Sequence, residues 1–208
     1  MSKDLGITIQ TAEEIFNKIK RWMEEGQVEG ELSDRIIASY VLIVMNHYDS
    51  IINLTKSGHH ISASALARPL YEAYIRATWI SSNITTTEVK KALKDLTKGR
   101  DNFPSLWEMT KAIDTSLKVD SFYKMQGYII GAFNNYTHGG THLISRCLGE
   151  EKIAPHFEVE DIMGGLQGAS YNALFAVLAF ASHTKNDTLA SNINKELHKL
   201  ASQIKDEE

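Results

Sequence analysis

Two groups of residues in this sequence carry the side chains that could do chemistry. Arg68, Glu72 and Arg76 are spaced four apart, so on a helix they share one stripe. Asn134 and His138 are also four apart, at or near the end of another apolar segment. Polar and ionisable groups within an apolar helical protein mark either a functional site or a buried structural network.

The neighbours of the charged stripe favour its partial burial. Large apolar and aromatic residues surround it and leave little of the helix circumference for solvent. On an exposed helix, such a stripe would be a salt ladder worth about 0.2–0.5 kcal/mol per pair. A partly buried Arg68–Glu72 pair must instead find further partners, because an unpaired buried charge is costly. The stripe is therefore either a structural network or the lining of a site.

His138 is the best candidate for acid–base chemistry, because histidine titrates near neutrality without help. The alternative is a helix-terminal histidine that bonds backbone carbonyls or interacts with the helix dipole. Both interpretations stay open. If the first is right, we expect a polar pocket that combines this histidine with residues from other helices, namely Asp49, Arg68, Glu72 and Asn134.

A metal site is not expected. His138 and His142 are four apart, which on an unbroken helix would suit a pair of metal ligands. Two glycines between them weaken the helix, and no carboxylate follows closely, although Glu72 could join through space. Cys147 is the single cysteine, which excludes an intramolecular disulfide and a cysteine-based zinc site. We predict neither a metal nor another cofactor.

Helices must position these side chains. Apolar residues recur at helical spacing, and no alternating strand pattern of useful length is present. Pro69 falls inside one helix and should bend it or mark a restart. The predicted fold is all-α: one domain over residues 1–208, a bundle of long antiparallel helices with short helices crossing one end. The predicted helices span about 11–25, 33–57, 61–82, 85–98, 105–117, 121–138, 158–183 and 187–204.

Composition narrows the function classes. The net charge of -4 argues against a large nonspecific nucleic-acid surface. The longest apolar runs, Tyr40–Met45 and Ala173–Ala181, are far shorter than the roughly 20 residues that a membrane span needs. The start of the sequence lacks a basic segment followed by an apolar run, so we expect no signal peptide. We expect a cytoplasmic protein that does not contact a membrane.

Two segments resemble those of known helical proteins. The stretch from Asp49 through Arg68-Pro-Leu-Tyr-Glu72, followed later by Tyr136-Thr-His-Gly, resembles an uncharacterised bacterial helical family with Arg-x-x-x-Glu and Tyr-Thr-His motifs. The same region is similar to the HEPN superfamily, helical domains common in toxin–antitoxin and phage-defence systems. The HEPN ribonuclease motif is an arginine, a polar residue and then a histidine. Asn134 and His138 match its last two elements, while Phe133 stands at the arginine position.

The resemblance implies metal-independent RNA cleavage in a toxin or phage-defence setting. It gives His138 the role of general acid/base and Asn134 that of orienting substrate. Because Phe133 stands at the arginine position, our hypothesis is that Arg68 stabilises the phosphate charge from a neighbouring helix. The alternative is a noncatalytic helical module that binds a ligand or a partner protein. The remaining candidate binding residues are Asp49, Glu72, Arg76, Tyr136 and His142.

The resemblance also implies assembly, because HEPN-like domains commonly pair. Small residues at Gly164, Gly168 and Ala169 would permit close helix contact. We therefore expect a homodimer, with RNA or a second protein as a further partner.

Overall fold

The computed structural model describes residues 2–25, 30–148, 153 and 155–205. Within these residues the chain forms nine α-helices, and the only β-structure is an isolated bridge between Leu148 and Ile153. The predicted all-α bundle is confirmed. The helices are α1 (Lys3–Glu25), α2 (Leu32–Lys56), α3 (His60–Asn83), α4 (Thr87–Leu96), α5 (Leu106–Leu117), α6 (Ser121–Thr137), α7 (Thr141–Ser145), α8 (Val159–His183) and α9 (Asp187–Lys205).

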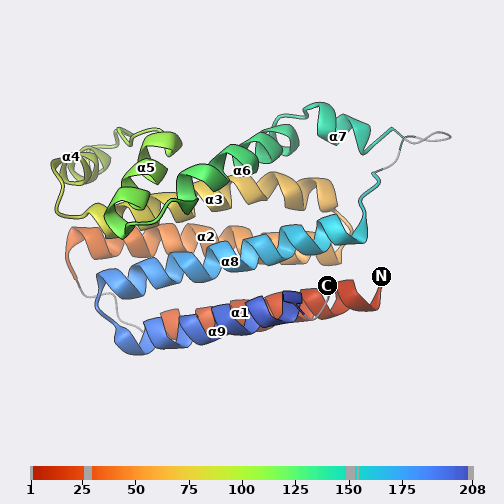
Figure 1. The fold of residues 1–208 in the computed structure, drawn as a ribbon, viewed down its shortest axis with the longest axis horizontal. Coiled ribbons are helices and arrows are strands. Elements are labelled where there is room, and N and C mark those ends of the chain that lie inside the picture. The colour runs from red at the N-terminus through yellow and green to blue at the C-terminus, as the bar shows by residue number, and fades with distance from the viewer. Residues whose placement is uncertain (1, 26–29, 149–152, 154, 206–208) are drawn as a thin grey trace.

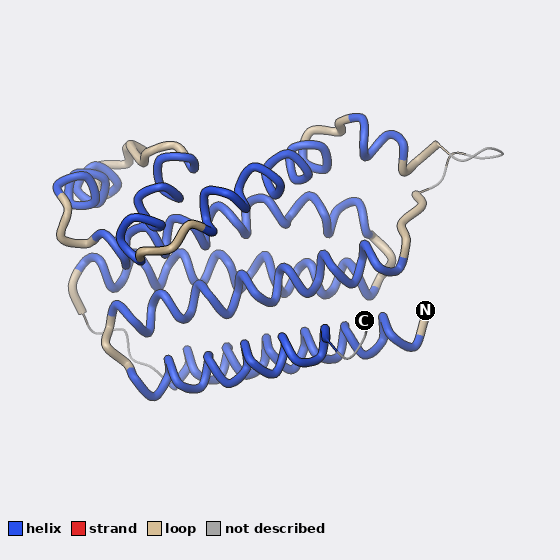
Figure 2. The backbone as a smooth tube through the Cα atoms, in the orientation of Figure 1, coloured by secondary structure: helices blue, strands red, loops and turns tan. Residues whose placement is uncertain are grey.

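Three long helices form the centre of the bundle. The hairpin of α2 and α3 packs against α8, which also contacts α1 and α9 on its other side (Figure 1). The helices α5 and α6 pack on α3, so α3 lies between the long core helices and the shorter ones above it. The backbone tube shows that most neighbouring helices are joined by short loops (Figure 2). This layering places α6 directly against one side of α3.

The first helix is longer than its sequence pattern predicted. We expected it to begin at Thr11, but α1 begins at Lys3. Leu5 and Ile9 are buried and continue the apolar face of the helix toward its start. Burial along this extra segment, about two helical turns, stabilises it more than the capping residue at Thr11 could stabilise a later start.

The third helix runs without interruption from His60 to Asn83 and contains Pro69. The alternative of a restart at this proline is therefore wrong. A proline removes one backbone donor, but tertiary packing can hold the helix together around it. Here Ala63 before the proline and Leu70 after it are buried, so both sides of the proline are anchored in the core.

A buried tyrosine links the outer layer to the core. The Tyr48 hydroxyl donates to the Ala12 carbonyl at 3.0 Å and lies 2.7 Å from the Ser170 hydroxyl. Tyr48 is fully buried, so its hydroxyl needs these partners to offset the loss of water. One side chain thus joins α1, α2 and α8.

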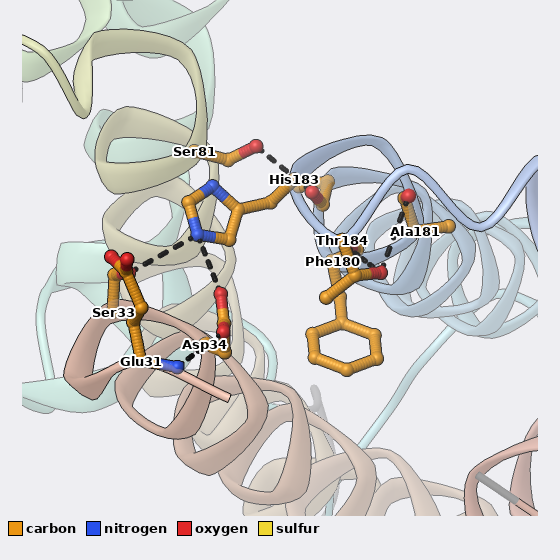
Figure 3. A network of polar contacts seen from close by, with 9 residues as sticks. Glu31, Ser33, Asp34, Ser81, Phe180, Ala181, His183 and Thr184 are labelled. Atoms are coloured by element: carbon orange, nitrogen blue, oxygen red, sulfur yellow. Dashed lines mark hydrogen bonds and ion pairs between the residues drawn. The ribbon is translucent and has the colours of Figure 1, made fainter. Parts of the chain in front are cut away.

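A polar cluster closes one end of the core, where α2 begins and α8 ends (Figure 3). His183 Nε2 lies 2.9 Å from a carboxylate oxygen of Asp34 and 3.3 Å from the Ser33 hydroxyl. The other carboxylate oxygen of Asp34 accepts from the backbone N–H of Glu31 at 2.6 Å. Nearby, the Ser81 hydroxyl donates to a carbonyl of α8 at 2.8 Å. The cluster therefore ties together the ends of α2, α3 and α8.

One helix in the described part of the chain, α8, is long and apolar enough to cross a membrane by length and composition. Its residues Leu174 and Val177 are fully buried against neighbouring helices. The core helix of a soluble bundle passes the same test, so this observation is weak evidence for a membrane span.

Candidate functional site

The charged stripe of α3 supplies the first half of the candidate site. The Arg68 Nε donates to a carboxylate oxygen of Glu72 at 2.8 Å, one helical turn away. The side chains of Arg68 and Glu72 are 27% and 31% exposed, so the pair is half-buried, as its apolar surroundings predicted. The Glu72 carboxylate fixes the guanidinium against the helix and leaves its outer nitrogens for other partners.

The second half comes from the end of α6. The Arg68 Nη1 donates to Asn134 Oδ1 at 2.5 Å and lies 3.0 Å from His138 Nε2. The two groups of residues that the sequence singled out thus meet in space. The further partners that the arginine was expected to need are Asn134 and His138.

Local backbone geometry sets the position of His138. It caps the C-terminus of α6, and its backbone N–H donates to the Asn134 carbonyl at 3.0 Å. Gly139 follows with φ +65°, the left-handed conformation in which glycine commonly ends a helix. Asn134 and His138 are therefore one turn apart, and both side chains reach toward α3.

The chemistry of the contact assigns the histidine tautomer. Arginine only donates hydrogen bonds, so His138 Nε2 must accept and Nδ1 must carry the proton. A fixed cation and an imidazole with an available N–H stand side by side. Asn134 and His138 are exposed, so a ligand in solvent can reach both. The arrangement can neutralise an anion and exchange a proton beside it.

Arg76 belongs to a different cluster, although it shares the stripe. Its guanidinium pairs with Asp101 at 3.4 Å and lies 5.0 Å from the centre of the Phe103 ring. Burial would lower the pKa of Arg76, but the hydrogen bond with Tyr40 and the charges of Asp101 and Glu72 together raise it. This predicted binding residue therefore holds the loop after α4 against α2 and α3.

Asp49 also lies apart from the cluster. It lines a cavity of about 490 Å³ between α1 and α2, together with residues such as Phe16 and Met45. Its carboxylate accepts from the Asn53 amide at 3.1 Å. The expected pocket thus comes together from Arg68, Glu72, Asn134 and His138 without Asp49, which faces another side of α2.

Tyr136 points away from His138 as well. It stacks on Phe157, with ring centres 6.3 Å apart, while the Arg146 guanidinium lies 5.4 Å from the same Phe157 ring. The ion pair with Asp161 and the hydrogen bond with Tyr136 raise the pKa of Arg146. These contacts fasten the chain after α7 to α8, which gives Tyr136 a structural role.

His60 is a polar residue that the sequence prediction of the site left out. Its ring centre lies 5.8 Å from that of Phe157, and it lines a cavity of about 140 Å³. Burial is the main cause that lowers the pKa of His60. Among the described residues its Nδ1 has no hydrogen-bond partner. Its position three residues before the buried Ala63 was the available signal that it faces inward.

The histidine pair considered as metal ligands does not share one helix. The helix α6 ends at Thr137, and His142 belongs to the separate α7, with its side chain outside the described part of the structure. Among the residues that the structure describes, no three or more His, Cys, Asp or Glu side chains gather as a metal site would require.

Comparison with known proteins places the chain in a family. A family model with the description "Family of unknown function (DUF6988)" matches residues 41–206, more than three quarters of the chain. The protein therefore belongs to the DUF6988 family. The match includes Arg68, Glu72, Asn134 and His138 and leaves out α1. Neither the curated proteins nor the solved structures contain a match to the chain.

Proposed function

We propose that this DUF6988 protein is a metal-independent ribonuclease of the HEPN kind, with His138, Arg68 and Asn134 at its active site. The observation that carries the proposal is the 3.0 Å separation between Arg68 Nη1 and His138 Nε2 on an exposed surface. A cation and an imidazole at this separation can act on one phosphodiester group.

The reaction would use the ribose 2′-hydroxyl of RNA as the nucleophile. When a phosphate takes over the Arg68 guanidinium, His138 Nε2 is free to accept the 2′-hydroxyl proton. The 2′-oxygen forms a bond to phosphorus, and the bond from phosphorus to the 5′-oxygen breaks. Water supplies the proton for the leaving oxygen. The products are a 2′,3′-cyclic phosphate and a 5′-hydroxyl.

The other residues would stabilise and position the reacting group. The Arg68 guanidinium offers donors in a fixed fork that suits phosphate oxygens, and it would offset the charge that grows in the transition state. Asn134, one turn before His138, would hold the substrate in register. Glu72 is a positioning residue, since it fixes Arg68 through Nε. Phe133 stands at the arginine position of the motif, so α3 would supply the cation instead of α6.

The biological setting is part of the same proposal. A toxin or phage-defence role rests on the HEPN resemblance, which together with the small residues of α8 also favours a homodimer as the active form. The cytoplasmic location is the expectation from the sequence. Light scattering at micromolar concentration tests the assembly. A mass near the chain mass of 23.3 kDa would overturn the homodimer.

The direct test compares the wild-type protein with His138→Ala on mixed single-stranded and structured RNA in the presence of chelator. We expect wild-type cleavage to leave cyclic phosphate ends, and His138→Ala to be slower by about 10²–10⁴-fold. His198→Ala is the matched control, because it removes an exposed histidine from α9, which packs on α8 and not on the α3–α6 contact that forms the site. Equal cutting by wild type and His138→Ala, or intact RNA with both, would reject the catalytic role.

One observation favours a second candidate, a noncatalytic ligand- or protein-binding module. The guanidinium of Arg68 already has Glu72, Asn134 and His138 as partners, so the cluster can serve as a structural link between α3 and α6. In that case His138→Ala would lower the unfolding midpoint, and RNA would stay intact with both the wild type and the variant.

A further inference from the structure

A large cavity lies between α6 and α8, with α3 as its floor. Its volume is about 640 Å³, within the range of roughly 300–1,000 Å³ that small-molecule sites commonly occupy. Leu70 and Tyr74 of α3 line its floor and are buried, whereas Met125 of α6 and Phe175 of α8 remain partly exposed at its sides. The cavity is therefore deep enough to enclose a ligand and open enough to admit one.

Three glycines of α8 leave the space that the cavity occupies. A Cβ atom added at Gly164, Gly165 or Gly168 would meet no other atom within 4 Å. All three residues line the cavity. In the described structure no neighbouring helix fills the space beside them, so side chains at these positions would project into the cavity.

Aromatic rings cover the wall beside this space. The Phe175 ring stacks with Tyr74 at 6.2 Å and 25°, and with Tyr171 at 6.2 Å and 22°. Phe122 of α6 lies 6.3 Å from Tyr74 at a tilted angle. Rings in offset-stacked and tilted arrangements offer both faces and edges to a further ring. A flat ring system is the ligand shape that this wall suits.

Among the described residues that line the cavity, none carries a charged side chain. Burial, with the nearby Asp114 carboxylate, raises the pKa of Tyr71 to about 12, and burial also raises the pKa of Tyr171. These phenols therefore stay neutral at physiological pH. Ser121 and Asn172 add polar groups without charge. An ionised ligand would lose its hydration here without gaining a counter-charge.

We propose that the cavity between α6 and α8 binds an uncharged, ring-containing small molecule. This site is distinct from the proposed ribonuclease site, because Arg68, Glu72, Asn134 and His138 do not line the cavity. Binding here can therefore succeed or fail whether or not the protein cleaves RNA.

The experiment titrates the full chain with N-phenyl-1-naphthylamine, an uncharged probe with two ring systems whose fluorescence rises in apolar surroundings. We expect saturable binding of one probe per chain. Gly168→Leu should fill the cavity and weaken binding by about tenfold or more. Gly164→Leu provides a second filled variant in case the first does not fold, which circular dichroism checks.

Gly131→Leu is the matched control. It places the same side chain on a helix at another glycine whose added Cβ meets no atom within 4 Å, outside the cavity lining. It should bind the probe as the wild type does. Equal probe affinity in the folded filled variants and in Gly131→Leu would overturn the proposal, because the probe would then occupy another groove. A wild-type dimer that Gly168→Leu converts to a monomer would also overturn it, because a second copy would be the occupant.

Discussion

Arg68 Nη1 and His138 Nε2 lie 3.0 Å apart, although 70 positions separate the two residues in the chain. One belongs to a helix with a fully buried core face, the other to the end of a helix in the outer layer. The candidate site therefore exists only while α6 is docked on α3. The first two predictions concern the chemistry and energetics of this contact, and the third concerns the opposite end of α6.

The first prediction concerns the planar shape of the Arg68 guanidinium, which a lysine ammonium group lacks. Arg68→Lys keeps the positive charge but cannot donate to Glu72, Asn134 and His138 from one planar group. We expect RNA cleavage to fall by about 10²-fold while the unfolding midpoint changes little. Arg35→Lys, an exposed change on α2, should leave both measurements unaltered. Full activity in Arg68→Lys would show that the guanidinium geometry is irrelevant.

The second prediction concerns the energy of the Arg68–Glu72 pair. Both side chains are half-buried, and Arg68 keeps two other partners when Glu72 loses its charge. Glu72→Gln should therefore lower the free energy of unfolding by only about 0.5–1 kcal/mol. Urea denaturation measures this change. A loss of about 3 kcal/mol or more would mean that the pair is effectively buried in solution.

The third prediction tests how the start of α6 is held. The buried Asp114 of α5 accepts from the backbone N–H groups of Phe122 at 3.0 Å and Tyr123 at 2.9 Å. Asp114→Ala should destabilise the protein by about 1–2 kcal/mol, because it leaves these N–H groups without their acceptor. Asp120→Ala, at an exposed ion pair, should cost less than about 0.5 kcal/mol. Equal losses of stability in Asp114→Ala and Asp120→Ala would argue that the Asp114 carboxylate does not hold the start of α6.

The fourth prediction concerns the polar cluster that closes the core. Asp34→Ala removes the carboxylate beside the His183 ring, whose side chain is only 9% exposed. It also removes the acceptor for the Glu31 N–H. We expect a destabilisation of about 2–3 kcal/mol in chemical denaturation. The double variant Asp34→Ala/His183→Ala should lose less stability than the sum of the losses in the two single variants, because both changes remove the same contact. Strict additivity would contradict this contact.

The fifth prediction is a loss of stability in alkali. An unfolded tyrosine ionises near pH 10, whereas the pKa of Tyr71 in the folded protein is about 12. The folded state therefore holds its proton more tightly, and this stabilisation is complete below pH 10. It disappears as the pH rises from about 10 to about 12, a loss of roughly 2–3 kcal/mol from Tyr71 alone.

Denaturation at several alkaline pH values, with tyrosinate absorbance as a second reading, checks this window. Tyr71→Phe removes the titrating phenol and should flatten the decline. An equally steep decline in that variant would assign the effect to other groups, such as the buried Tyr48 and Tyr74, whose pKa values burial also raises.

The sequence predicted the long helices and the partial burial of Arg68, because both follow from local spacing of apolar residues. It missed the short helix α7, which is too short for such a pattern. It could not predict which face of α2 meets which neighbour, so Asp49 was placed in the wrong group of side chains. The same applies to His183 and Asp34, which are distant in the chain and meet only after α2 and α8 pack. Local patterns determine which residues turn inward, whereas the choice of partner depends on the tertiary arrangement.

The docking of α6 has a consequence for hydrogen exchange. It packs mainly on α3 and α5, and the cavity lies beside its inner face. Elements with fewer buried apolar contacts open locally at a lower free energy than the whole protein unfolds. The amides of α6 should therefore exchange faster than those of α3. Each local opening would separate His138 from Arg68 while the core stays folded, so the fraction of intact sites depends on the opening equilibrium of one helix.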